Sequence, residues 1–316
     1  MNHPATRVNN LRNFDVEANQ FSLNMAKITM EHAPDPLGFH VDLGFGRAFD
    51  IVHSTEKAPD IFRYLEQAYI SYKPSKAKGL QLDLGEFVTW AGAEVIETQG
   101  NWNYSRSLLF AYAIPYYHFG LRATMPLGSH FTAGAALVNG WNNIEDNNSG
   151  KTVALMGSYT NHLFTWTHNY IVGPEKTDTN KGQRQLYDTT LLLTPTPKAN
   201  FYINYDYGVD KNILHGGNRW VGIAGAARFA VNGWLAFAPR LEWFNDADGF
   251  ATGTVQKVKE GTLTGEIKLR EGVLTRLEYR HDWSNVPFFD RGNQPGSYGN
   301  QNTLLAGFVV FFGPKR

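Results

Sequence analysis

Ionisable side chains stand at every second position in several segments of this sequence. Within residues 276–282 the charged positions are Arg276, Glu278, Arg280 and Asp282. Leu277 and Tyr279 lie between them, so a strand here would have one charged face and one apolar face. Charges of both signs cannot line a dry core, but they can pair and keep an aqueous path hydrated. The pattern favours the passage of polar solutes over bond-making chemistry.

Nine ionisable residues of this kind are predicted to line such a path. They are Arg122, Arg184, Asp188, Arg240, Glu242, Glu266, Arg276, Glu278 and Arg280. For most of them a purely structural role explains the pattern at least as well, because each cross-strand pair stabilises a sheet by roughly 0.2–1 kcal/mol. Arg122 and Arg240 are only slightly favoured as functional lining residues.

Patterns for catalysis and metal binding are weak. His118, His168 and His281 each fall in a candidate strand, but no serine and acidic partner accompany them at the spacing of a hydrolase. The turn DADG at 246–249 hints at calcium, yet it lacks the following ligand series and is better interpreted as an ordinary turn. We therefore predict no enzymatic activity, no metal and no cofactor.

Composition narrows the class of protein. The 316 residues include 29 Lys plus Arg and 29 Asp plus Glu, so no net charge favours nucleic acid as a partner. No stretch approaches the roughly 18 uninterrupted apolar residues of a membrane-spanning helix. Cysteine is absent, which fits an exported envelope protein but also many cytosolic ones. Abundant aromatic residues and glycine indicate many short strands and turns.

Alternation recurs in about fifteen segments. The length of these segments is close to the roughly 9–11 residues of a tilted membrane strand. One example sets Leu235, Phe237, Leu241 and Trp243 against Arg240 and Glu242. The predicted fold is all-β: a transmembrane, antiparallel, up-and-down β-barrel of about 16 strands. A soluble sandwich also alternates with period two. Aliphatic residues within the apolar face and aromatic residues at its ends, as in Tyr187 followed by Leu191 and Leu193, favour the membrane barrel.

Turn chemistry separates the strands. Short links such as 194–197 alternate with longer polar loops such as 142–150 and 285–301. This arrangement is typical of outer-membrane barrels. No domain boundary is visible, so residues 1–316 are predicted to form one domain. The closing strand would be the C-terminal run with Leu304, Ala306, Phe308, Val310 and Phe312, although Gly313-Pro314-Lys315-Arg316 follows it.

The block from Leu84 to Arg122 carries the most distinctive motif. It contains GEFVTWAGAEVIE at 85–97, NWNYSRSLLF at 101–110 and IPYYHFGLR at 114–122, after LRNFD at 11–15 and QFSLN at 20–24. In order and spacing these motifs resemble the β-barrel porin-2 family, the OmpL-like porins of bacterial outer membranes. The resemblance implies an outer-membrane location, contact with membrane lipid, and passive diffusion of small hydrophilic solutes or ions without an energy source. Porins of about sixteen strands are often homotrimers, which is an expectation by analogy.

Two departures from the family affect these expectations. Family members tend to carry Lys at the position of Glu86 and Pro at that of Trp90, so the charge near the constriction is expected to differ. Bacterial single-chain barrels also have even strand counts, and fifteen is odd. Residues Met1 to Arg12 are polar and contain no apolar signal-peptide core. We therefore hypothesise that a first strand and a signal peptide precede this sequence.

The segment 88–113 is too long for an ordinary barrel turn. By analogy with porins that fold a loop into the lumen, Glu94, Glu97 and Arg106 are predicted to narrow the pore, with opposite charges setting a transverse field. Two alternatives remain open. The segment could be an extracellular lid, or it could contain an additional strand at 105–113.

Two other functions remain open beside general diffusion. In a sugar-specific channel, lumen-side aromatics such as Trp220, Trp234 and Tyr202 would stack on pyranose faces. In a structural or adhesive barrel the lumen would be plugged. Planar-bilayer conductance separates the three: open steps, a sugar-dependent block, or silence.

Overall fold

Antiparallel strands dominate the computed structural model, which describes residues 2–56, 59–212 and 216–313. The strands in these ranges are β1 (Ala26–His32), β2 (Leu37–Phe45), β3 (Leu65–Tyr72), β4 (Gln81–Val88), β5 (Tyr117–Leu127), β6 (Phe131–Val138), β7 (Thr152–Thr160), β8 (Phe164–Lys176), β9 (Thr179–Thr196), β10 (Ala199–Asn212), β11 (Gly216–Ala230), β12 (Leu235–Asp246), β13 (Gln256–Arg270), β14 (Val273–Ser284), β15 (Phe289–Arg291), β16 (Gln294–Tyr298) and β17 (Asn300–Val310). Helical segments are short. They are α1 (Arg47–Val52), α2 (Pro59–Phe62), the 3-10 turn η1 (Thr98–Gly100) and α3 (Leu108–Tyr112).

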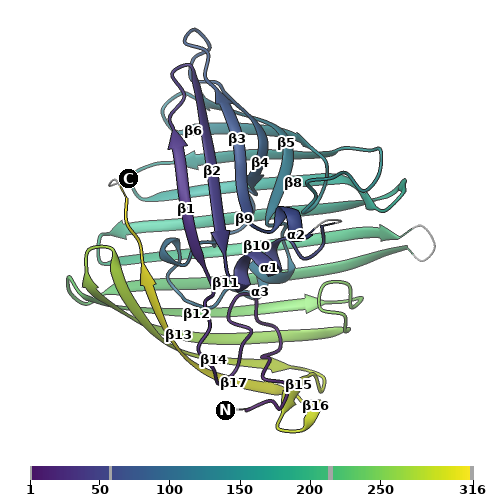
Figure 1. Ribbon diagram of the computed structural model, residues 1–316, viewed down its shortest axis with the longest axis vertical. Helices are drawn as coiled ribbons and strands as arrows, with labels where there is room; N and C mark the ends of the chain where they lie inside the picture. The colour runs from purple at the N-terminus through teal and green to yellow at the C-terminus, as the bar shows by residue number, and fades with distance from the viewer. Residues whose placement is uncertain (1, 57–58, 213–215, 314–316) are drawn as a thin grey trace.

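Fifteen of the described strands form one sheet in which each strand pairs with the next along the chain, from β1 to β14 and then β17. Strands β15 and β16 form a separate hairpin within the β14–β17 connection. Figure 1 shows the sheet twisting from the upright β1 and β2 to the nearly horizontal β9 to β13. The prediction of an all-β, up-and-down antiparallel architecture with about fifteen strands in this sequence is confirmed. The strand expected before residue 1 stays a prediction.

The two faces of the sheet differ as the alternation predicts. On β14, Leu277 and Tyr279 are 53% and 47% exposed on the outer face, while Arg276 and Arg280 on the inner face are each 1% exposed. An outer surface of exposed apolar side chains is suited to contact with lipid, because lipid tails are apolar and such a surface leaves no polar group without a partner. The closing strand β17 follows the same rule, with Leu304 and Phe308 exposed. Residues 314–316, which follow the predicted closing run, lie outside the described residues.

The connections also differ between the two ends of the strands. At one end most are short, as at 128–130, 161–163 and 271–272. At the other end several are long, as at 46–64 and 89–116. In the described part of the chain, no helix is both long enough and apolar enough to cross a membrane.

The inner face of the sheet encloses a packed centre. Leu108 and Leu109 of α3 are fully buried, and they belong to one apolar cluster with Phe49 of α1, Trp220 of β11 and Phe244 of β12. These residues come from two long connections and from strands far along the chain. The long connections therefore pack against the concave side of the sheet.

Candidate functional site

Residues 89–116, here called the insert, join β4 to β5 and lie against the inner face of the sheet. The alternative of an additional strand at 105–113 is wrong, because Leu108–Tyr112 forms helix α3. Ser107 begins this helix, and its hydroxyl accepts a hydrogen bond from the Phe110 amide at 3.0 Å.

Side chains from several strands hold the insert. Asn169 of β8 donates to the Trp90 carbonyl at 3.2 Å, and Asn204 of β10 accepts from the Ala93 amide at 3.2 Å. Arg240 of β12 donates to the Ser105 carbonyl at 2.8 Å. Because these contacts extend from β8 to β12 in the sheet order, the insert lies across the concave face.

Arginines of β14 satisfy backbone carbonyls of the insert. Arg276 donates to the Thr98 carbonyl at 2.7 Å, to the Asn103 carbonyl at 3.1 Å, and to the Asn101 carbonyl. Arg280 donates to the Arg106 carbonyl at 2.6 Å. Each guanidinium has five N–H donors in a fixed plane, so one side chain can serve several carbonyls that no secondary structure satisfies.

Glutamates of the same wall satisfy the amides of the insert. Glu278 accepts from the Tyr104 amide at 2.7 Å and from the Ser105 amide at 3.0 Å. Glu242 accepts from the Leu108 amide at 2.8 Å, at the start of α3. Buried backbone groups are costly when unpaired, so this complementary set explains how a loop with little secondary structure can stay ordered inside the sheet.

The charged wall is built from cross-strand rows. Glu242, Glu260 and Asp282 face one another across β12, β13 and β14, and the neighbouring row contains Arg240 and Arg280. The two rows compensate each other: Arg240 Nε lies 2.8 Å from Glu260 Oε1, and Arg280 Nε lies 2.9 Å from Asp282 Oδ1. Adjacent acidic residues would otherwise repel across the sheet.

The three predicted constriction residues occupy different environments. Arg106 is 2% exposed and donates to three carbonyls of the insert, those of Val95, Tyr104 and Ile96. Glu94 accepts from Arg240 at 2.7 Å and from the Ser107 amide at 2.6 Å. The side chain of Glu97 is 23% exposed and pairs with Lys27. Among the described residues no ion pair joins Arg106 to Glu94 or Glu97.

Lys27 of β1 is a charged residue that the sequence analysis missed. Its amino group lies 2.9 Å from Asp42 and 3.3 Å from Glu66, and it also pairs with Glu97. Glu66 is the extra residue of a bulge between β2 and β3, so strict alternation assigns it to the wrong face. Carboxylate oxygens of Asp42, Glu66 and Glu97 lie within 4.8 Å of one another, and Lys27 supplies the compensating charge.

The remaining predicted lining residues also have partners. Arg122 pairs with Asp83 at 2.8 Å and lies over the Phe87 ring at 4.3 Å. Arg184 pairs with Asp210 at 2.9 Å. Further pairs link Asp188 to Asn169 and Asn204, and Glu266 to Arg228 and Arg276. The bracing interpretation therefore has geometric support for this set.

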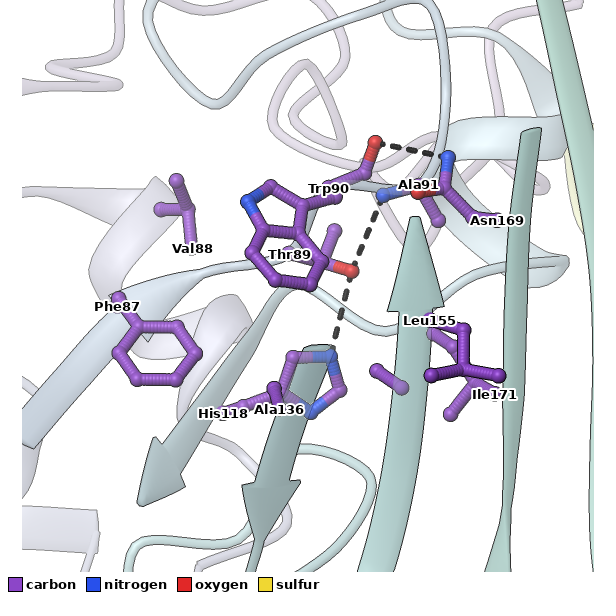
Figure 2. A pocket seen from close by; sticks show the side chains of 11 residues that line it. Phe87, Val88, Thr89, Trp90, Ala91, His118, Ala136, Leu155, Asn169 and Ile171 are labelled. Carbon is purple, nitrogen blue, oxygen red and sulfur yellow. Dashed lines mark hydrogen bonds between the residues drawn. The ribbon is translucent and has the colours of Figure 1, made fainter. Parts of the chain in front are cut away.

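The histidines and the acidic turn have local partners. His118 contacts the Gly140 carbonyl at 2.9 Å. It also contacts Thr89 Oγ1 at 3.3 Å (Figure 2). His168 contacts the Tyr187 hydroxyl, and His281 contacts Asn302. The Asp246 carboxylate accepts from the amides of Phe250, Ala251 and Thr252 and from the Thr252 hydroxyl. These bonds are those of a capped turn.

A cavity of about 300 Å³ separates the insert from the wall formed by β8, β9 and β10. Tyr202 lines it, whereas the other two aromatics considered for sugar stacking do not. Trp220 is 1% exposed and donates to the Ala113 carbonyl at 3.1 Å. Trp234 is 55% exposed in the β11–β12 turn. Trp90 and Trp102 of the insert line the cavity instead.

Comparison with known protein families identifies the class of protein to which the chain belongs. The family described as "Putative beta-barrel porin-2, OmpL-like" matches residues 1–312. The chain belongs to this family. It is an outer-membrane porin, and the family resemblance of the 84–122 block is confirmed. No curated protein matches the sequence.

Solved structures show the same fold as this porin at low sequence identity. OmpT of Vibrio cholerae is 13% identical, with a TM-score of 0.59 and coverage of 91% of this chain and 89% of that one. OmpF of Salmonella typhi, solved with daunomycin, is 12% identical, with a TM-score of 0.60 and coverage of 91% and 89%. The anion-selective porin from Comamonas acidovorans is 12% identical, with a TM-score of 0.59 and coverage of 91% and 88%.

The β2–β3 connection of this porin is expected to lose stability in mild acid. Burial lowers the pKa of His53 to about 4, so between pH 6.5 and 4 the unfolded chain binds more protons than the native one. Stability should therefore fall as pH drops through this window, by about 2 kcal/mol between pH 7 and 5. The measurement is the thermal midpoint at both values. His53→Gln should reduce the difference, and His130→Gln, at an exposed turn, should leave it unchanged.

Proposed function

We propose that small hydrophilic solutes and ions diffuse through the barrel along the gap between the insert and the β8–β10 wall. The observation that carries this proposal is the asymmetry of the insert. Five charged side chains bind its backbone on the β12–β14 side, namely Arg240, Arg276, Arg280, Glu242 and Glu278. On the β8–β10 side the backbone contacts of Asn169 and Asn204 leave a cavity of about 300 Å³. A barrel that its insert partly fills, with a cavity beside the insert, would have a low conductance and would select solutes by size. The proposal includes no enzymatic step.

We propose that the insert forms the constriction and that the three predicted residues have different roles in it. Glu97 is partly exposed and does not itself line the cavity, so its carboxylate and the neighbouring Lys27 would act on passing ions through their electric field. Glu94 and Arg106 are buried and bonded to the insert or its anchor, so they would act by keeping it in place. The lid alternative is less favoured because the insert bonds to side chains of the inner face.

Planar-bilayer recording of the purified porin tests both parts. We expect open steps in salt alone, and silence would contradict diffusion and favour a plugged barrel. Glu97→Gln should shift the reversal potential away from cation preference, and Lys27→Met should shift it towards cations. Asp178→Asn, at the exposed β8–β9 turn, is the control. Unchanged selectivity after replacing Glu94, Glu97 and Arg106 together would contradict the constriction.

A homotrimer is also proposed. It is supported by the trimer form of the OmpT structure from Vibrio cholerae, which is 12% identical, with a TM-score of 0.59 and coverage of 91% of each chain. Cross-linking in native membranes should then yield a species of three subunits.

A further inference from the structure

Hydroxyl groups form one wall of the cavity beside the insert. Thr165 and Thr167 of β8 and Thr190 of β9 line it. Ser158 pairs with Thr167 at 2.9 Å, and Thr160 pairs with Thr165 at 3.2 Å, so the hydroxyls continue onto β7. Each hydroxyl can both donate and accept, so this wall can bond to a ligand's hydroxyl groups without a fixed polarity.

Three aromatic rings also line the cavity, two of them on the side of the insert. Trp90 and Trp102 come from the insert and Tyr202 from β10. The Trp102 and Tyr202 ring centroids lie 5.2 Å apart at an interplanar angle of 34°. Indole and phenol faces contact apolar C–H surfaces favourably while their edges remain polar.

The residues on both sides of Trp102 are anchored. Asn101 donates to the Val95 carbonyl at 2.8 Å and to the Glu97 carbonyl at 2.9 Å. Asn103 donates to the Ala238 carbonyl at 2.9 Å and to Thr264 at 2.7 Å. The backbone that carries the indole is therefore fixed before any solute arrives, which reduces the entropy lost on binding.

Trp90 is seated just as firmly. Figure 2 shows its carbonyl bonded to Asn169 and the neighbouring Thr89 hydroxyl bonded to the Ala91 amide and to His118. A Cβ added at Gly134 of β6 would lie 2.9 Å from the Trp90 ring, so glycine is what lets the indole lie against the sheet.

The cavity has hydroxyls and rings but little free charge. Glu94 is the one ionisable carboxylate among its described lining residues, and Arg240 and the Ser107 amide occupy its two oxygens. Because Arg240 compensates the charge of Glu94, a site with threonine hydroxyls and two indole rings complements a neutral ring that has hydroxyls on its edge and C–H groups on its faces. Its volume is at the lower end of the roughly 300–1,000 Å³ of small-ligand sites.

We propose that this cavity is a binding subsite for neutral saccharides in transit, in which Trp90 and Trp102 stack on the sugar ring and Thr165 and Thr167 bond to its hydroxyls. The proposal rests on the diffusion function above. It adds a preference for sugar rings over open-chain polyols of the same size, because an open chain offers no flat face to the indoles.

Single-channel current in planar bilayers, recorded while glucose, maltose or sorbitol is added, tests this subsite. Glucose and maltose should reduce the current saturably, and sorbitol should act only through viscosity. Trp90→Ala and Trp102→Ala should each raise the half-blocking maltose concentration by roughly fivefold to tenfold. Trp234→Ala removes an exposed tryptophan of the β11–β12 turn and should change nothing.

The outcomes separate the two proposals. Open steps in salt with no saturable block by either sugar would overturn the saccharide subsite and leave diffusion standing. Block that persists undiminished in both cavity variants, or that Trp234→Ala weakens equally, would also overturn it. If a variant fails to insert, Trp102→Phe keeps an aromatic face and should retain most of the block, and loss of block in that folded variant would contradict stacking.

Discussion

Replacing Arg240 by methionine is expected to destabilise the barrel by about 3–5 kcal/mol. The guanidinium is fully buried and lies 2.7 Å from Glu94, 3.1 Å from Glu242 and 2.8 Å from Glu260. Removing it leaves three acidic groups in a confined region without their shared cation. It also removes the bond to the Ser105 carbonyl, so the insert should loosen as well.

The thermal midpoint in detergent and the temperature at which the folded band disappears on gels measure this effect. Lys259→Met is the matched control, because it removes a cation from the exposed outer side of the neighbouring strand β13. A midpoint for Arg240→Met equal to that of Lys259→Met would contradict the inferred role. Glu94→Gln should partly restore the midpoint of Arg240→Met, because it removes one of the uncompensated acids.

Shortening the insert is expected to raise single-channel conductance several-fold. A variant in which residues 92–113 are replaced by a brief glycine-serine linker removes α3 and Trp102, one of the two cavity tryptophans. Water should fill the vacated volume and solvate Arg276, Arg280 and Glu278, which lose their backbone partners. The expected increase follows from the wider path.

The control for this experiment is removal of 293–297, an exposed part of the β15–β16 hairpin, which should leave conductance unchanged. Equal conductance of the wild type and the shortened variant would show that the narrowest part lies elsewhere. A shortened variant that folds but conducts less would contradict the proposed path outright.

The strands could be predicted from the sequence because the residues of each strand alternate between apolar and polar types, which shows the two environments on its two faces. Leu277 is exposed and Arg276 buried on adjacent positions of β14, as alternation requires. The contacts of the inward groups could not be predicted in the same way. Alternation assigns a residue to a face but does not say what lies opposite, and Arg276 bonds to carbonyls that are more than 170 positions earlier in the chain.

The candidate site was predictable in location but not in detail. The length of 88–113 and its concentration of charged residues single out the insert, but an irregular segment has no periodicity from which side-chain directions can be read. The sequence therefore could not predict that the Arg106 side chain would donate hydrogen bonds to carbonyls of its own loop. Lys27 alternates with Ile28 and Met30 of β1, but alternation does not show that acidic groups of other segments lie opposite it. Glu66 was missed because a bulge interrupts the alternation of β3.

The anchoring of the insert has a consequence for the order of assembly. Its partners Arg240, Arg276 and Glu278 lie between 135 and 178 positions later in the chain. Such distant pairings form slowly, because the intervening chain must first be organised. Translation delivers residues 89–116 before β12 to β14, so the segment cannot form its bonds to Arg240, Arg276 and Glu278 until these strands are in place. A nascent barrel would thus begin as a wide, water-filled cylinder and acquire its narrow bore in a late maturation step.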